Sequence, residues 1–206
     1  MHPIIGQAGL ILQAEVEWRP EELDDLAMVL ERFSAALGDA ARLRRVFAGL
    51  TLRRVQAGAG MHYAGRRLIT LGNGLFYQHG HPDHQLWGPR VAIAHELAHY
   101  WDWTTVPWWL RWLGGNGRWV KGLTALERAE PGPTWWARER GPVESWAETV
   151  AGYLFPEYFA FLRLEAPARE VMVWTSPTGD SFTYPGLAPL HNGYIRRCFE
   201  MARGQE

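Results

Sequence analysis

The stretch His95–His99 reads HELAH, an H-E-x-x-H pattern within a segment whose apolar residues recur at helical spacing. Gly88 and Pro89 offer a helix start just ahead of it. Two histidines four positions apart project from one face of a helix, so both imidazoles can bind one metal ion. Glu96 can accept a proton from water beside that ion. The stretch predicts a helix with two zinc ligands and a general base; the alternative is a core helix with hydrogen-bonded histidines.

A second amphipathic helix is predicted to begin at Pro142 and to end near Pro156, because apolar residues recur there every three or four positions. Glu144 and Glu148 lie four apart and share one face of it. Catalytic zinc sites usually have three protein ligands, so two histidines require a third. Glu144 can complete the set, and Glu148 can orient a ligand histidine through its other ring nitrogen. The alternative is two solvated glutamates on a surface helix.

H-E-x-x-H followed by a glutamate on a second helix resembles the gluzincin metallopeptidases, and most closely the catalytic domain of anthrax lethal factor and its relatives. In that group an aspartate stands three residues after the second histidine, as Asp102 does here, and the second helix carries Glu-x-x-Ala-Glu, as at Glu144–Glu148. The resemblance covers residues 88–160. It implies a zincin-like fold and one Zn²⁺ ion with Glu96 as the general base. The ligands that it implies are His95, His99 and Glu144.

Asp102 lies about one turn beyond His99, near the face that would carry the metal. To act as a ligand it would have to bend back along the helix axis. We therefore expect it to support a ligand histidine or a helix end, with a plain surface acid as the alternative.

The resembling proteins place a tyrosine that stabilises the transition state shortly before the ligand glutamate. This chain departs from them, because residues 135–137 read Trp-Trp-Ala there. The motif therefore leaves the oxyanion donor unassigned. The candidates in the C-terminal segment are Tyr184, His191 and Tyr194.

The composition fits one folded domain over residues 1–206, with 47% hydrophobic and 21% charged residues. A net charge of −1 gives no electrostatic support for nucleic-acid binding. The single cysteine, Cys198, excludes an internal disulfide. No apolar run approaches about 20 residues, and the first residues lack the basic region of a signal peptide. We therefore expect no transmembrane segment and a cytoplasmic protein.

The rest of the pattern predicts an α+β fold in which a small sheet packs on the active-site helix. Helices are expected over residues 20–37, 39–48 and 190–203, and a further one is expected to run through Glu165. Strands are expected within residues 50–77, including one at 68–71. In the resembling family a strand at that point borders the cleft and pairs with extended substrate.

Nine of the twelve tryptophans fall between Trp101 and Trp146, mostly in a Trp-rich insertion over residues 100–141 that connects the two metal-bearing helices. Three interpretations stay open. The rings can pack a small subdomain, line a pocket for a bulky apolar side chain of the substrate, or contact lipid headgroups through residues 107–113. Peripheral membrane contact is the least favoured of the three.

The sequence thus predicts a zinc metallopeptidase that hydrolyses peptide bonds in a peptide or protein substrate, with Glu96 as the general base. A narrower form of this hypothesis is a protease with one protein target. An alternative from another class is a catalytically vestigial zinc-binding module that docks a partner or a membrane surface through the Trp-rich insertion.

Overall fold

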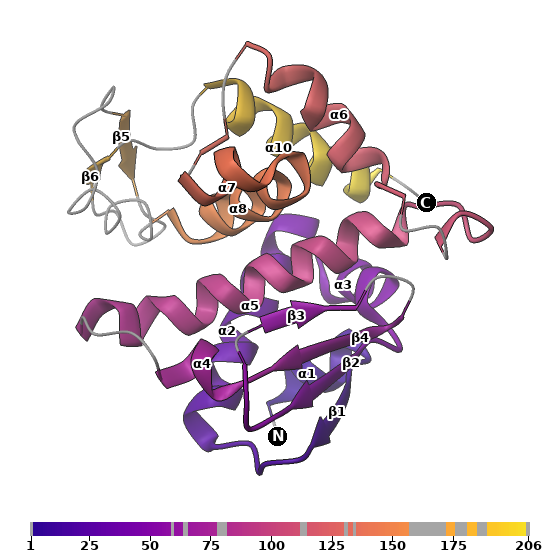
Figure 1. The fold of residues 1–206 in the computed structure, drawn as a ribbon, viewed down its shortest axis with the longest axis vertical. Coiled ribbons are helices and arrows are strands. Elements are labelled where there is room, and N and C mark those ends of the chain that lie inside the picture. Colours follow the sequence, from indigo (N-terminus) through magenta and orange to yellow (C-terminus); the bar gives the residue numbers. More distant parts are fainter. Residues whose placement is uncertain are drawn as a thin grey trace.

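One long helix, α5 (Pro82–Thr104), crosses the middle of the molecule between a sheet-bearing half and a helical half (Figure 1). The computed structural model describes residues 2–58, 60–63, 66–77, 82–111, 115–129, 132–133, 135–156, 172–175, 181–184 and 189–204. The helix that was expected to run through Glu165, the side chain of Tyr184 and residue Trp112 lie outside what is described.

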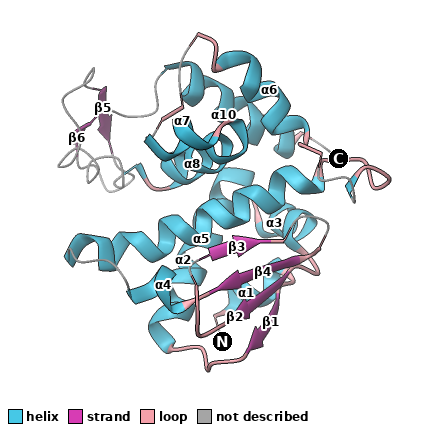
Figure 2. Ribbon diagram, in the orientation of Figure 1, coloured by secondary structure: helices cyan, strands magenta, loops and turns pink. Residues whose placement is uncertain are grey.

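The sheet-bearing half is built from residues that precede α5. Its elements are α1 (Pro3–Ala8), β1 (Ile11–Ala14), α2 (Pro20–Leu37), α3 (Ala40–Phe47), β2 (Thr51–Arg54), β3 (Gly60–His62), β4 (Leu68–Leu71) and α4 (Asn73–Tyr77). The strand order is β1-β2-β4-β3; the first three strands are parallel, and β3 runs antiparallel to β4 (Figure 2). The fold is therefore α+β, as the sequence predicted.

Local signals explain the two long helices of this half. Helix α2 begins at Pro20 and ends before Gly38, whose φ of 104° favours glycine. Helix α3 is capped by Asp39, whose carboxylate accepts a hydrogen bond from the Arg42 backbone N–H at 2.7 Å. The predicted helices over 20–37 and 39–48 are confirmed.

The predicted strand at 68–71 is confirmed as β4, and β2 also lies within the predicted range of 50–77, but β4 has no free edge. It lies between β2 and β3, so both of its edges are paired, and β3 forms the edge beside α5. The expectation that 68–71 pairs with substrate is therefore wrong. The edge strand was missed because three residues that begin with a glycine give no alternating pattern. Residues 73–77, expected to be extended, form α4.

Helix α5 starts earlier than predicted. Pro82 occupies its first position, where a proline fits, and Pro89 lies inside the helix. The prediction treated Pro89 as a start because an internal proline removes a backbone hydrogen bond and usually interrupts a helix.

The helical half follows α5 along the chain. Its elements are α6 (Arg118–Leu126), α7 (Trp135–Arg140), α8 (Pro142–Leu154), the antiparallel pair β5 (Met172–Thr175) and β6 (Ser181–Tyr184), and α10 (Pro189–Arg203). Helix α8 packs along α5, while α6, α7 and α10 pack against α8. One hydrophobic cluster joins both halves through α5. The predicted helices at 142–156 and 190–203 are confirmed.

Between Trp101 and Trp146, the tryptophan side chains that the structure describes include a buried and an exposed set. Trp101, Trp119 and Trp146 are buried with ring centroids 5.3–6.2 Å apart, so these three rings are packed, but in the main hydrophobic cluster rather than in a separate subdomain. Trp108 and Trp109 are instead 80% and 56% exposed. No helix in the described part of the chain has the length and apolar character needed to cross a bilayer.

A buried ion pair fixes the end of the sheet nearest α4. Arg54 and Glu22 are each 1% exposed and form two hydrogen bonds, Nε to Oε2 at 3.0 Å and Nη2 to Oε1 at 2.9 Å. The same guanidinium donates to the backbone carbonyls of Val55 and Leu71 and to the side-chain oxygen of Asn73. One side chain thus ties together the start of α2, the ends of β2 and β4, and the start of α4.

The Glu22→Ala variant leaves the Arg54 charge buried without its carboxylate. We expect the free energy of unfolding, measured by urea denaturation, to fall by about 3–5 kcal/mol. Asp24→Ala is the matched control in the same helix: its carboxylate pairs with His2 but is 63% exposed, so the loss should stay below about 1 kcal/mol. Equal losses in the two variants would contradict the anchoring role.

Candidate metal centre

Three side chains from two helices converge between α5 and α8. His95 and His99 lie one turn apart on α5, and Glu144 lies in the first turn of α8. The Nε2 atom of His95 is 3.0 Å from Oε2 of Glu144 and 3.0 Å from Nε2 of His99. The Nε2 atom of His99 is 3.6 Å from Oε1 of Glu144. One ligand atom from each residue lies within 4.8 Å of the others, so the three can hold one metal ion.

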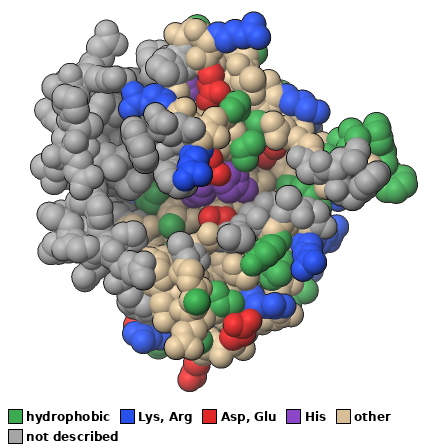
Figure 3. All heavy atoms as spheres, in the orientation of Figure 1, with side chains coloured by type: hydrophobic (Ala, Val, Ile, Leu, Met, Phe, Trp, Pro, Cys, Tyr) green, Lys and Arg blue, Asp and Glu red, His purple; other side chains and the backbone are tan. Residues whose placement is uncertain are grey.

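This group is accessible from outside. Each of the three side chains is partly exposed. In Figure 3, histidine side chains lie beside acidic side chains near the centre of one face of the molecule. A small molecule or an extended chain can therefore approach the metal-binding atoms.

A tryptophan holds the two ligand helices in register. Trp146 lies between Glu144 and Glu148 on α8, and its indole N–H donates to the backbone carbonyl of Ala98 at 2.9 Å. Ala98 lies directly before His99 in the chain. This hydrogen bond therefore fixes the position of α8 along α5, beside the two histidines. The Trp146 ring is fully buried, and the contact is shielded from water.

Glu148 lies on the other side of His95. Its Oε1 atom is 3.0 Å from Nδ1 of His95, and its side chain is buried. A proton on Nδ1 directs the lone pair of Nε2 toward Glu144 and His99, which is the tautomer that binds a metal through Nε2. The structure thus places Glu148 in contact with the second ring nitrogen of His95, the position that the predicted role requires.

The carboxylates control the protonation of His95. Burial by itself lowers the pKa of His95, but the hydrogen bonds to Glu144 and Glu148 together with the negative charges of Glu148 and Glu96 outweigh it and raise the pKa to about 10. His95 is therefore protonated at neutral pH when no metal is bound. A metal ion must displace this proton to reach Nε2.

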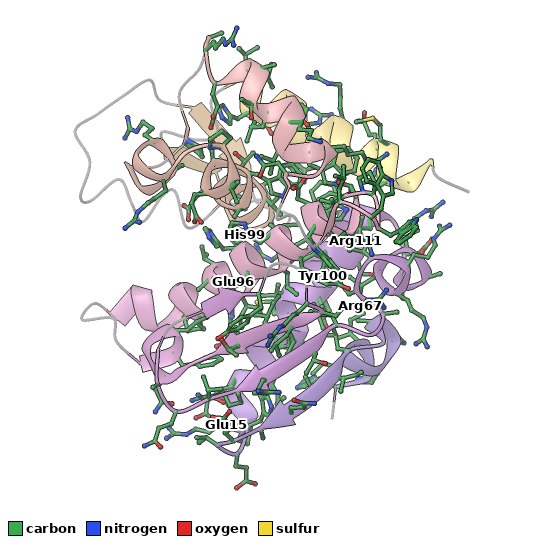
Figure 4. The ribbon with its side chains drawn as sticks, turned by 45° about the vertical axis from the view of Figure 1, so that its right-hand side comes forward. Glu15, Arg67, Glu96, His99, Tyr100 and Arg111 are labelled. Atoms are coloured by element: carbon green, nitrogen blue, oxygen red, sulfur yellow. The ribbon has the colours of Figure 1, made fainter. Side chains whose placement is uncertain are left out.

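Glu96 lies on α5 beside the sheet rather than in the ligand group. Figure 4 labels Glu96 and His99 on α5, between the two halves of the molecule. The carboxylate of Glu96 packs against Gly60 of β3: a Cβ atom at Gly60 would lie 2.8 Å from its Cγ and Oε1. The predicted general base is thus placed next to the edge strand.

Asp102 binds a helix end, which is one of the two roles expected for it. The helix is α6, whereas Asp102 itself belongs to α5. Its Oδ2 accepts from the Gly117 N–H at 2.7 Å, and its Oδ1 accepts from the Trp119 and Val120 N–H groups at 3.0 Å each. Burial raises the pKa of Asp102 and these three donors lower it, with a net rise. Its side chain is buried, so the surface-acid alternative is wrong. Its hydrogen bonds do not support a ligand histidine.

Of the predicted oxyanion donors, the structure describes the side chains of His191 and Tyr194, and it brings neither to the metal group. His191 is fully buried. The Tyr194 hydroxyl donates to the Trp119 carbonyl at 2.7 Å, so it is directed toward α6. Tyr184 belongs to β6, and its side chain lies outside the described part of the chain. The sequence could not exclude His191 and Tyr194, because their burial depends on how α10 packs.

Comparison of the chain with protein-family models, with curated proteins and with solved structures finds no match.

The pKa of His95 predicts a pH dependence of metal binding. Between about pH 7 and pH 9, zinc binding should release close to one proton from His95, so affinity should rise about tenfold per pH unit. A histidine with an ordinary pKa of 6.5 would release almost none in this range. Calorimetry in buffers of different ionisation enthalpy measures the released protons. The Glu148→Gln variant lacks one of the carboxylates that raise the pKa of His95, so this variant should release fewer protons when it binds zinc. A zinc affinity of the unmodified protein that does not change with pH would contradict the prediction.

Proposed function

We propose that the protein is a zinc-dependent peptidase with a zincin-like arrangement. The proposal depends on one observation, the convergence of His95, His99 and Glu144 into a group that can hold a metal ion. Two imidazoles and a carboxylate are the ligand set of many catalytic zinc sites, which leave one coordination position open. The hydrogen bond that His95 Nδ1–H donates to Glu148 fits this use, since ligand histidines usually have such a partner. The donor set therefore suits Zn²⁺.

Each residue has a distinct role in peptide hydrolysis. A zinc ion in this group would supply a Lewis acid for the peptide carbonyl and lower the pKa of water to about 7. Glu96 accepts a proton from the water that adds to the carbonyl carbon. It then donates that proton to the leaving amine as the C–N bond breaks. Glu148 keeps His95 in the orientation that binds metal.

The edge of the sheet supports a peptide as the substrate. The backbone N–H of Tyr63 donates to the carbonyl of Leu68, so these residues form a hydrogen-bonded pair of the β3–β4 ladder. Such pairs alternate in an antiparallel ladder, so Gly60 and His62 direct their backbone N–H and C=O groups away from β4. Within the described residues, no strand pairs with that side of β3. An extended peptide could add there as a further strand, beside Glu96.

The alternative function is a zinc-binding module that docks a partner or a membrane surface. The observation that favours it is the exposure of Trp108 and Trp109 on a turn that is held in place. Arg111 donates to the carbonyls of Thr104 and Val106 at 2.9 Å each, so the pair is presented on a fixed support. Exposed aromatic rings of this kind are typical of interaction surfaces.

The metal ligands are tested by Glu144→Ala. Removing one of three ligands should lower zinc affinity by more than about 100-fold, measured by competition with a chelator of known affinity. Glu127→Ala is the control, because Glu127 is a glutamate just past the end of α6 and outside the metal group. Unchanged zinc stoichiometry and affinity in Glu144→Ala would remove Glu144 from the ligand set.

Catalysis is tested by Glu96→Gln, which keeps the size of the side chain but cannot accept a proton. We expect this variant to bind zinc as the unmodified protein does and to lose about 100-fold or more of its kcat on a cleaved peptide. Cleavage sites come from a diverse peptide library analysed by mass spectrometry. If the zinc-loaded protein cleaves nothing in the library, the module is favoured; if Glu96→Gln cleaves as well as the parent, Glu96 is not the base.

A further inference from the structure

We propose that Gly60 is a positioning residue for Glu96: the backbone of the edge strand forms the surface against which the general-base carboxylate lies, and any side chain at this position displaces it. The inference rests on the proposed function for its catalytic consequence. The contact itself can be tested without activity.

The three atoms nearest to a Cβ at Gly60 all belong to one side chain. A Cβ atom at Gly60 would lie 2.8 Å from both Cγ and Oε1 of Glu96 and 3.0 Å from its Cδ. Real Cβ atoms essentially never approach other heavy atoms so closely. Gly60 pairs with Leu71 in the β3–β4 register, and Leu71 is fully buried on the inner face of the sheet. A side chain at Gly60 would therefore point inward, toward α5.

Backbone conformation does not explain the glycine. The described glycines with positive φ, where other residues are strained, are Gly9, Gly38, Gly49, Gly58 and Gly141. Gly60 is absent from that set and lies within a regular strand pair. The close approach of Glu96 is thus a feature of the described structure that requires the absence of a side chain here.

The contact separates function from folding. At Gly72 and Gly117, an added Cβ would lie 2.1–2.3 Å from backbone oxygens, which cannot move without disturbing the fold. At Gly60 it would meet the end of a flexible side chain on the surface of α5. A methyl group there moves the Glu96 carboxylate and leaves the strand and the helix in place. A general base must lie within about 3 Å of the proton that it removes, so such a displacement lowers the rate.

The position of Gly60 also explains why the base and the substrate would meet. Its N–H and C=O point toward the open side of β3, while the side-chain direction points to Glu96. Gly60 would thus present its backbone groups to an extended peptide, and it would also position the Glu96 carboxylate that acts on that peptide.

The experiment compares Gly60→Ala with Gly115→Ala, a control glycine with no atoms within 4 Å of an added Cβ and no positive φ. With the zinc-loaded protein and a cleaved peptide, Gly60→Ala should lose about tenfold or more in kcat, with little change in KM and the same zinc stoichiometry. Gly115→Ala should match the parent. Wild-type kcat in Gly60→Ala would overturn the inference while leaving the proposed peptidase intact.

A second measurement needs no activity. Thermal unfolding of the metal-free protein is compared for Gly60→Ala, Glu96→Ala and the double variant. Because the three atoms nearest to the added methyl all belong to Glu96, Gly60→Ala should lower the Tm more in the parent than in the Glu96→Ala background. Additive shifts would overturn the inference. Absence of peptidase activity in the parent, together with non-additive shifts, would reject the proposed function and keep the contact.

Discussion

The candidate site depends on the docking of α8 against α5, because its three metal-binding side chains come from these two helices. The hydrogen bond from the Trp146 indole to the Ala98 carbonyl fixes the position of α8 along α5. Trp146 is in turn packed against Trp101 and Trp119, with ring centroids 5.3 and 6.2 Å away. The tryptophans near the site thus act through packing: they hold Glu144 opposite the histidines by filling the space beneath the site.

The charges of the site favour a cation. Glu144 and Glu148 each contact one ring nitrogen of His95, and Glu96 adds a third negative charge close enough to raise its pKa. Without a metal, the proton on His95 compensates part of this charge. A divalent ion would compensate more of it and would replace the direct contacts between the ligand atoms with bonds to a common centre. The arrangement therefore suits a bound cation better than an isolated hydrogen-bonded cluster.

The sequence was informative where a pattern is long or a residue type is rare, and uninformative where three-dimensional packing decides. The ends of helix α2 could be predicted because Pro20 and Gly38 mark them. The group that can hold a metal ion could be predicted because histidines and glutamates stand at helical spacing. The partner of Asp102 could not be predicted, since it belongs to α6, fifteen to eighteen residues away. The edge strand β3 was not predicted, because a single glycine such as Gly60 by itself indicates a turn.

The two halves of the molecule control different parts of the proposed chemistry. The helical half places Glu144 and Glu148 against the histidines, and the sheet-bearing half places Gly60 against Glu96. That second placement depends on the buried guanidinium of Arg54, which binds the Leu71 carbonyl, while Leu71 pairs with Gly60. Helix α5 carries the histidines and the base and is shared by both halves. In the proposed mechanism, metal affinity and proton transfer should therefore be separable, because each depends on a different neighbour of the same helix.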